Sequence, residues 1–446
     1  MIEAKNLITR YLPQPVIICI KTVKSWFWGA IFKINLFFVK TNHKKALVNA
    51  KNKISKNQKI KIVFFVIHES VWKYDDVYKL LLADGKYELF IVIVPYIVYG
   101  KQIMLSEMDR AFEYFSDRGF RTIKALSNND GQWLDIKRVI NPDIVFFTNP
   151  HNITRKEYCI SSWKNSLTCY TQYSFHITHL NFVQYDQLFH NIIWKLFYET
   201  PIHMELAKKY ARNKAENVVV TGYPGTDIFL NKEYEPKNNW KFRNKAIKRI
   251  IWAPHHTILP EDSNLGYSTF LVYYNFFPTM LKKFRGEIQI AFKPHPILKA
   301  KLYNYSGWGK KRTDAYYSFW RNCEFGQLEE GEYADLFLTS DALIFDSASF
   351  MTEYIYTEKP SLFLVRNNEI INRFNNFGEL VFNHIYHARN RKDIGEFIQK
   401  IVLLGGDEKK DARLKFKEAF LLPPNNTFAS SNIYNYISNQ LAKEDK

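Results

Sequence analysis

Three short motifs in the second half of the chain gather side chains that can bind and move phosphate groups. Each motif follows an apolar run that is typical of a buried strand. The side chains in question are His255 and His256 after the first run, Lys293 and His295 after the second, and Asp346, Ser347, Ser349 and Glu353 after the third. Because parallel strands end at one edge of a sheet, we expect these side chains to share one site.

The third motif spans Asp346–Pro360 and opens a helix directly after a strand. Free backbone N–H groups and the positive end of a helix dipole suit a phosphate there. Ser347 and Ser349 add hydroxyl donors, and Glu353, one turn further on, is spaced to accept hydrogen bonds from ribose hydroxyls. Ordinary capping of a core helix by Ser and Asp is the alternative interpretation.

The other two motifs hold cations and imidazoles in stiff loops. Lys293 and His295 alternate with two prolines, which suits contact with a diphosphate. The adjacent His255 and His256 belong to a residue type that binds metals, but no acidic or cysteine partner stands at helical spacing. We therefore predict phosphate contact or structural support for these two residues, no metal ligand, and no cofactor other than a nucleotide-activated donor that is consumed as substrate.

Histidines in the first half of the chain are the candidates for a general base. His176 and His179 follow an apolar run, and His is the natural base for a hydroxyl nucleophile near neutral pH. Which of the two is the base stays open, as does a purely structural role. His68 and Ser70 follow the first strong apolar run and are predicted to lie on the acceptor side of the same site.

The elements that position these residues alternate between strand and helix. Apolar runs at 61–67, 90–98, 122–126 and 142–147 are separated by helical stretches, and a second set lies at 249–253, 289–292, 342–345 and 361–365. This alternation predicts two parallel α/β domains of Rossmann type facing a cleft, which is the GT-B architecture. We assign 59–230 to the first, acceptor domain, 231–248 to a linker, and 249–446 to the second, donor domain.

Positive charge is concentrated at the start of the chain. The net charge is +18, and residues 1–60 contain twelve Lys or Arg and a single acidic residue, Glu3. Residues 11–40 mix aromatic residues with lysines, which interrupt every window long enough to span a bilayer. We predict that 1–58 is a basic amphipathic helical segment that contacts an anionic membrane surface; a helical hairpin packed on the main body is the alternative. The four cysteines form no CxxC pair, so reduced, cytoplasmic thiols are expected.

The second-domain motifs resemble the CDP-glycerol glycerophosphotransferase family of teichoic-acid and capsule enzymes. The resemblance is carried by a strand followed by an APxxx loop at Ala253–Thr257, a K-x-H-P loop at Lys293–Pro296, and D-S-A-S with a later acid at Asp346–Glu353. A G-x-P-x-x-D turn at Gly222–Asp227 also matches the family. Taken together, the matching pieces are spread over about 60–400. The D-S-x-S pattern with a later Glu resembles GT-B nucleotide-sugar enzymes as well, including UDP-sugar epimerases.

The resemblance implies transfer of a polyol phosphate to a hydroxyl of a lipid-linked or polymeric glycan acceptor, at the cytoplasmic face of the membrane. A first-domain His would deprotonate the acceptor, and His295 would assist the leaving phosphate. CDP-glycerol, CDP-ribitol and nucleotide sugars remain open as donors, so a nucleotide-sugar glycosyltransferase is the alternative within the same fold. A non-catalytic lipid- or nucleic-acid-binding protein is the alternative of another class; we expect no nucleic acid as partner, and an oligomer is compatible with the sequence.

Overall fold

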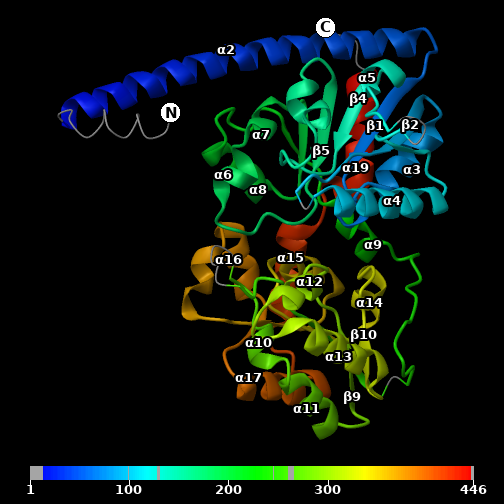
Figure 1. The fold of residues 1–446 in the computed structure, drawn as a ribbon, viewed down its shortest axis with the longest axis vertical. Coiled ribbons are helices and arrows are strands. Elements are labelled where there is room, and N and C mark those ends of the chain that lie inside the picture. Colours follow the sequence, from blue (N-terminus) through cyan, green and yellow to red (C-terminus); the bar gives the residue numbers. More distant parts are fainter. Residues whose placement is uncertain (1–13, 99, 128–130, 245, 260–265, 443–446) are drawn as a thin grey trace.

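The computed structural model describes residues 14–98, 100–127, 131–244, 246–259 and 266–442, with side chains from Gly29 onward. Two α/β domains follow one another along the long axis of the molecule, and a long helix lies across the far end of the first domain (Figure 1). The predicted pair of parallel-sheet domains is confirmed.

The first domain is built on a seven-stranded parallel sheet in the order β3-β2-β1-β4-β5-β6-β7. Its central strands are continuous apolar runs because both of their faces are covered by helices. The strands are β1 (Ile60–Val66), β2 (Tyr87–Ile93), β3 (Thr122–Lys124), β4 (Ile144–Phe147), β5 (Leu167–Thr171), β6 (Lys195–Tyr198) and β7 (Val218–Val220). The helices between them are α3 (Asp75–Asp84), α4 (Lys101–Asp117), α5 (Ile136–Val139), α6 (Asn181–Tyr185), α7 (Leu188–Ile192) and α8 (Pro201–Tyr210), and α9 (Asp227–Leu230) follows β7.

The second domain has a six-stranded parallel sheet in the order β10-β9-β8-β11-β12-β13. Trp252 lies fully buried in its core and stacks on Phe277 at 4.2 Å between ring centroids. The strands are β8 (Lys248–Ala253), β9 (Ile288–Phe292), β10 (Gly326–Leu328), β11 (Ala342–Phe345), β12 (Ser361–Leu364) and β13 (Tyr386–Ala388). The α-helices are α10 (Phe270–Tyr273), α11 (Phe276–Lys283), α12 (Leu298–Asn304), α13 (Gly309–Asn322), α14 (Ala334–Thr339), α15 (Ala348–Glu353), α16 (Asn376–Asn383), α17 (Arg391–Glu396) and α18 (Lys410–Phe416).

Each sheet has a point at which the strand order reverses. In the first sheet the chain leaves β1 toward β2 on one side and returns to β4 on the other, and in the second sheet β8 and β11 have the same relation. Ligands of open α/β sheets bind at the carboxyl ends of the strands at such switch points. The loops that follow β8 and β11 carry two of the three predicted donor motifs, so these two motifs flank the second switch point.

The helix across the top is α2 (Gln14–Ser55), a single continuous helix of 42 residues, so the hairpin alternative is wrong. Its second half packs on the first domain through the buried Val39, His43 and Ala50, and Lys53 pairs with Asp143 at 2.7 Å. Apolar residues and lysines are spread around the helix instead of being separated into two faces, so the predicted amphipathic character is not confirmed. Residues 1–13 of the predicted segment lie outside the described residues. Within the described chain, no helix combines the length and apolarity needed to cross a membrane.

The last helix, α19 (Ala429–Ala442), returns from the second domain to the first. Its Ile433, Ile437 and Leu441 join the core that covers β1 and β2, and its Tyr434 hydroxyl donates to Asp84 of α3 at 2.9 Å. The second domain was predicted to extend through 446, but residues 429–442 pack as part of the first domain. The chain therefore crosses between the domains twice.

The two crossings lie at 231–247 and near Pro423. The first is an extended stretch held to the second domain by Trp240, whose Nε1 donates to Thr339 at 3.0 Å. The second packs on the G-x-P-x-x-D turn: a Cβ on Gly222 would lie 2.7 Å from Pro423, and Gly222 has a left-handed φ of 88°. Asp227, at the end of that turn, accepts from the backbone N–H groups of Ala429 and Ser430, at 2.8 Å each, and so caps α19.

Candidate active site

Three histidines meet at the carboxyl edge of the second sheet. His255 and His256 follow β8 and His295 follows β9, and one ring nitrogen from each lies within 4.8 Å of the other two. The ring centroids are 4.2 Å apart for His255 and His256 and 4.3 Å apart for His256 and His295. The fold therefore brings the His255–His256 loop and the His295 loop together, as the sequence predicted. Proximity alone suits either a metal ion or an anion, and the positions of the protons distinguish the two.

The proton on His255 is fixed by Thr257. The Thr257 hydroxyl oxygen accepts from the backbone N–H groups of Tyr267 at 2.9 Å and Ser268 at 3.2 Å, which occupies both lone pairs. Its own hydrogen is then donated to His255 Nδ1 at 2.9 Å. A neutral imidazole whose Nδ1 accepts carries its proton on Nε2. His255 therefore presents an Nε2–H donor.

His295 is fixed in the same tautomer by its own loop. Its Nδ1 accepts from the backbone N–H of Ile297 at 3.2 Å, so Nε2 carries the proton. Burial, followed by the nearby His256, Lys301 and Lys293, lowers the pKa of His295 to about 3, and burial also lowers the pKa of His255 well below its usual value. Both rings are thus neutral N–H donors. A metal ion needs the lone pair that Nε2 lacks in this tautomer, so the arrangement favours an anionic oxygen over a metal.

Cationic side chains surround the three imidazoles. Arg366 donates to the Thr257 carbonyl at 3.3 Å, and Lys301 is close enough to affect the pKa of both His255 and His295. Lys293 is buried, which lowers its pKa to about 8, and its ammonium donates to the Gly331 carbonyl at 2.5 Å beside an acidic loop. The positive surroundings suit a diphosphate, and the Lys293 ammonium, which uses one of its three donors on Gly331, has two left for a phosphate oxygen.

In the Asp346 motif the aspartate has a structural role, Ser347 is also buried, and Ser349 is only half-buried. The Asp346 carboxylate is fully buried and accepts from the His255 backbone N–H at 2.5 Å and from the Thr269 N–H and hydroxyl at 2.5 and 2.7 Å. These internal bonds hold the His255 loop in place, and the predicted contact of Asp346 with the donor stays a prediction. Ser347 is the N-cap of α15 and makes no side-chain capping bond, and Ser349 is half-buried on the first turn.

The Glu353 carboxylate is already hydrogen-bonded within the protein. It is buried and accepts from the Tyr333 hydroxyl, which in turn accepts from Lys73 of the first domain at 3.3 Å. Burial raises the pKa of the Glu353 carboxyl. Glu353 thus ends a polar chain that crosses between the domains, and its predicted contact with a ribose stays a prediction.

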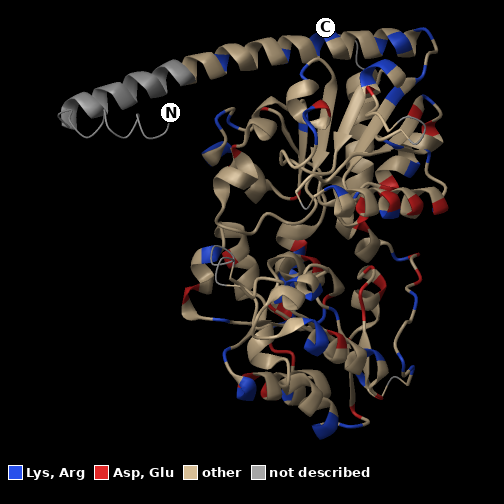
Figure 2. Cartoon of the chain, in the orientation of Figure 1, with Lys and Arg blue, Asp and Glu red and all other residues tan. Residues whose placement is uncertain are grey.

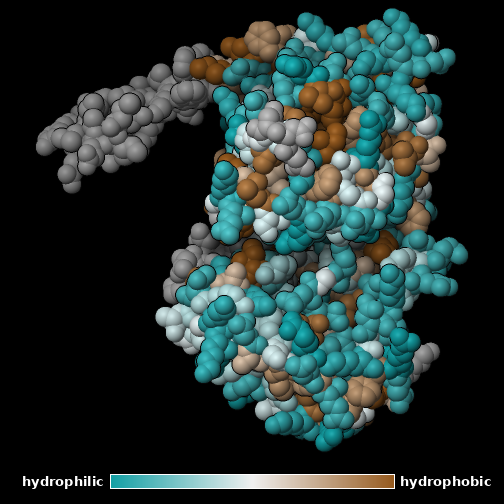
Figure 3. All heavy atoms as spheres, turned by 45° about the vertical axis from the view of Figure 1, so that its right-hand side comes forward, coloured by the Kyte–Doolittle hydropathy of each residue, from teal (hydrophilic) through white to brown (hydrophobic). Residues whose placement is uncertain are grey.

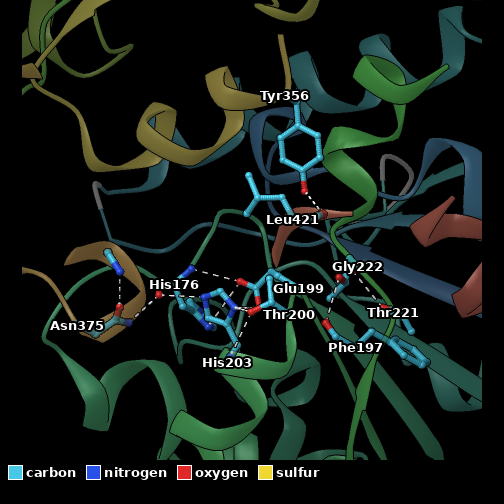
Figure 4. Close-up of polar contacts among 12 residues, drawn as sticks. His176, Phe197, Glu199, Thr200, His203, Thr221, Gly222, Tyr356, Asn375 and Leu421 are labelled. Atoms are coloured by element: carbon cyan, nitrogen blue, oxygen red, sulfur yellow. Dashed lines mark hydrogen bonds and ion pairs between the residues drawn. The ribbon is translucent and has the colours of Figure 1, made fainter. Parts of the chain in front are cut away.

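The first domain contributes His176, which lies in a cluster of buried polar side chains (Figure 4). Its backbone N–H donates to Glu199 at 3.2 Å, and the same carboxyl lies 3.9 Å from His176 Nδ1. Burial and the nearby His203, His190 and His151 lower the pKa of His176 well below its usual value. Burial raises the pKa of Glu199 to about 8. His176 is thus a neutral imidazole whose Nδ1 has no hydrogen-bond partner in the described chain.

The loop that carries His176 and His179 is held by the second domain. Asn375, the N-cap of α16, donates its Nδ2 to the His176 carbonyl at 2.7 Å (Figure 4). Its backbone N–H donates to the Ile177 carbonyl at 2.9 Å. His179 is exposed, and its Nδ1 donates to the Arg373 carbonyl at 3.1 Å, which leaves the lone pair on Nε2. We call this contact, between residues 176–179 and 373–378, the interdomain clamp. Phe374 of the clamp stacks on Tyr267, which contacts His255, so the two sets of predicted histidines are joined through it.

His68 and Ser70 lie at the carboxyl end of β1, at the same edge of the first sheet. The Ser70 hydroxyl is 2.7 Å from His68 Nδ1, and the His68 and Tyr96 rings are 6.0 Å apart. Their acceptor-side position remains a prediction. Sequence reasoning missed Glu199, His203, Asn375 and Tyr267. Of these, only Glu199 carries a visible signal, an isolated acid directly after the apolar run that forms β6.

Two parallel α/β domains whose strand-end loops bring two groups of histidines to the same side of the molecule are typical of the GT-B transferase fold. A model of the CDP-glycerol:poly(glycerophosphate) glycerophosphotransferase family matches residues 192–439, more than half of the chain. The chain belongs to this family, and the reaction class is transfer of glycerol phosphate. None of the curated proteins compared with the chain matches it.

Solved structures agree with the fold. The wall teichoic acid polymerase TagF is 16% identical, with 92% of this chain and 98% of that chain covered at a TM-score of 0.55. An S. aureus MnaA–UDP co-structure is 15% identical, with coverages of 87% and 99% and a TM-score of 0.54. The UDP-GlcNAc 2-epimerase from Neisseria meningitidis bound to UDP-GlcNAc is 15% identical, with coverages of 87% and 100% and a TM-score of 0.51.

Proposed function

We propose that the chain binds CDP-glycerol, or a related CDP-polyol, at the second switch point and transfers its polyol phosphate to an acceptor hydroxyl held by the first domain. The observation that carries this is the pair of neutral Nε2–H donors, His255 and His295, surrounded by Lys and Arg. A TagF variant has been solved after a soak with CDPG, which is consistent with a donor of this kind in the family. The proposed reaction uses no cofactor and no metal ion.

The chemistry follows from the donor. The acceptor hydroxyl loses its proton to His176 and attacks the phosphorus that bears the polyol, and the bond from that phosphorus to the bridging oxygen breaks. CMP leaves with the bridging oxygen. The Nε2–H groups of His255 and His295 and the nearby cations stabilise the charge that grows on the phosphate oxygens. Glu199 lies 3.9 Å from His176 Nδ1 and stabilises the imidazolium in those molecules in which its carboxyl, with a pKa of about 8, is ionised.

His295 acts in this scheme as a hydrogen-bond donor. In the free protein burial lowers the pKa of His295 to about 3, so the ring is neutral before the donor binds. The negative charge of a bound diphosphate would raise this pKa, toward the protonated general acid that the family resemblance implies. Removal of His295 should slow turnover at least about a hundredfold, the usual cost of one preorganised donor to a developing charge.

The test measures CMP release by the purified full chain with CDP-glycerol, CDP-ribitol and UDP-sugars as separate donors. His295→Ala and His176→Ala should abolish most turnover with the CDP donor, and His295→Ala should in addition weaken donor binding in a calorimetric titration. His384→Ala, which removes a half-buried histidine directly after α16, is the control. Turnover with UDP-sugars alone would overturn the glycerophosphate assignment in favour of glycosyl transfer. Loss of turnover in His179→Ala but not in His176→Ala would identify His179 as the general base instead of His176.

We infer that α2 brings the enzyme to an anionic membrane surface, where a lipid-linked or polymeric acceptor would be held. The helix contains no acidic residue, and Figures 2 and 3 show its lysines and, beside the undescribed segment, its hydrophobic residues. Ile34, Phe37 and Phe38 are 57%, 67% and 60% exposed. Exposed apolar side chains beside lysines suit the headgroup region of a bilayer.

Vesicle co-sedimentation tests this second proposal. Replacing Phe37 and Phe38 together by Glu should reduce binding to vesicles that contain phosphatidylglycerol. Leu404→Glu, at a residue that is 77% exposed in the second domain, should not. Equal binding by all three proteins would refute a role for α2.

A further inference from the structure

A histidine that the reaction scheme does not use, His203, lies against the backbone of His176 (Figure 4). It belongs to the first turn of α8, which begins directly after β6 with Thr200 as its N-cap. The side chain is fully buried, so both ring nitrogens need partners inside the protein. Each has one: Nε2 lies 3.2 Å from the His176 carbonyl oxygen, and Nδ1 lies 2.8 Å from the Thr200 hydroxyl oxygen.

The position of the His203 proton follows from these two partners. A carbonyl oxygen can only accept, so Nε2 carries the proton and donates it to His176. Burial lowers the pKa of His203 to about 3, so the ring is neutral and Nδ1 has no proton. The Thr200 hydroxyl oxygen accepts from the His203 backbone N–H at 3.4 Å, and its own hydrogen goes to Nδ1. Thr200 therefore sets the tautomer in which His203 presents a fixed donor to His176.

The backbone of His176 is held on both sides of its Cα. Its N–H donates to Glu199 at 3.2 Å, and its carbonyl accepts from His203 and, at 2.7 Å, from Asn375 Nδ2. Glu199 and His203 come from one short unit, the end of β6 and the first turn of α8. With both flanking peptide groups fixed, the imidazole keeps only its side-chain torsions, which have a few preferred values. The contacts of His203 therefore help to decide where the His176 ring lies.

The second domain supports His203 in turn. The His203 ring packs on the ring of Phe377 in α16 with 4.3 Å between the centroids, and Phe377 is fully buried. Asn375, the other donor to the His176 carbonyl, is the N-cap of the same helix. One helix of the second domain thus contacts or supplies both of the donors that hold this carbonyl.

We propose that His203 is a positioning residue for the general base: its Nε2–H, fixed by Thr200, holds the His176 backbone so that the imidazole meets the acceptor hydroxyl. The proposal rests on the proposed function, in which His176 removes the acceptor proton. His203 touches neither substrate in this scheme, so its removal should lower kcat and leave KM unchanged. A misplaced reacting group can cost about a hundredfold in rate. Because Asn375 still donates to the carbonyl, we expect a smaller loss, about tenfold, in line with one hydrogen bond.

The test measures CMP release by the full chain with CDP-glycerol as donor and poly(glycerol phosphate) as acceptor. His203→Phe keeps an aromatic ring against Phe377 but removes the Nε2–H, and His203→Gln restores an N–H donor near the same place. We expect kcat to fall about tenfold in His203→Phe and to stay within about twofold of the wild type in His203→Gln, with KM for CDP-glycerol unchanged in both. His190→Phe is the matched control, since His190 is a buried first-domain histidine whose ring nitrogens have no hydrogen-bond partner within the described chain. It should keep the wild-type kcat.

Each rate is divided by the number of CDP-glycerol sites found by calorimetry, so that a merely structural role, which would lower only the share of folded protein, leaves kcat per site unchanged. Wild-type kcat per site in His203→Phe, or an equal loss in His203→Gln, overturns the positioning role, while loss of turnover in His176→Ala still upholds the base. Full turnover in His176→Ala would instead overturn the base and the role of His203 with it. If His203→Phe does not fold, Thr200→Val, which removes the hydroxyl that sets the tautomer, decides the result: wild-type kcat per site there refutes the proposal.

Discussion

Gly378 is the residue of the interdomain clamp at which a single methyl group should disable the enzyme. A Cβ at this position would fall well inside 3.0 Å of the Ile177 carbonyl oxygen and at 3.0 Å from Phe374 Cβ. Real Cβ atoms do not occupy such positions, and an ordinary contact begins at 3.4 Å. Gly378→Ala must therefore push α16 away from the His176 loop by roughly 1 Å, since neither neighbour is the end of a flexible chain.

The magnitude follows from two opposing effects. An alanine within α16 gains about 1 kcal/mol of helix propensity, and the overlap costs roughly 1–3 kcal/mol. The net change in the free energy of unfolding should be a loss of at most about 2 kcal/mol, so the variant folds. A displacement of 1 Å at a reacting group can cost about a hundredfold in rate, so kcat should fall by about that factor while donor affinity is unchanged.

The control is Gly395→Ala, on α17, where a Cβ meets nothing within 4 Å. This variant should be slightly stabilised and fully active. The assays are thermal unfolding, CMP release and calorimetric titration with CDP-glycerol. A folded Gly378→Ala protein with wild-type kcat would refute the idea that the clamp positions the base, and an equal loss of donor affinity would show that the clamp instead shapes the donor site.

Four further outcomes are expected. Thr257→Val removes the hydroxyl that fixes the His255 proton, and it leaves the N–H groups of Tyr267 and Ser268 without their acceptor. The variant should lose roughly 2–4 kcal/mol of unfolding free energy, measured by thermal unfolding, and should bind the donor more weakly in a calorimetric titration. Because His255 and His295 act as neutral donors, donor affinity should not fall between about pH 6 and pH 8; a steep fall in a calorimetric pH series would contradict this. Burial raises the pKa of Glu199 from 4.5 to about 8, so the folded state binds this proton more tightly than the unfolded state does. The stability that the bound proton provides is complete below about pH 4.5 and is lost by about pH 8. In thermal unfolding, Glu199→Gln should therefore become more stable relative to the wild type as the pH rises through that window. Wild-type CMP release should survive EDTA, and restoration of lost activity by a divalent ion would make the three histidines metal ligands after all.

The sequence predicts the fold well because buried parallel strands leave a simple pattern. β1, β4, β8, β9, β11 and β12 were all identified from continuous apolar runs, and the residues after them were correctly expected to share an edge. Helices leave a weaker signal in the sequence. The helical stretch over 268–285 is interrupted between Tyr273 and Phe276, and within 131–139 only Ile136–Val139 is helical.

The candidate site was predictable at the level of motifs but not of contacts. Asp346 and Glu353 carry the residue types that bind a nucleotide, yet their partners, Thr269 and Tyr333, come from loops that no local pattern connects to them. Asn375 is an ordinary N-cap by sequence, and its second bond, to His176, depends on how two domains meet. The return of α19 was equally invisible, because an apolar helical face does not reveal which domain it covers.

The return of α19 has a consequence for synthesis on the ribosome. Ile433, Ile437 and Leu441 are among the last residues of the described chain, yet they belong to the core that covers β1, which is made early. The first domain therefore cannot complete its core as it emerges, and it waits with an apolar surface uncovered while the whole second domain is translated. Such delayed closure exposes a nascent chain to aggregation. We expect chaperone capture of ribosome-bound chains that stop before residue 429 and its release once α19 has emerged.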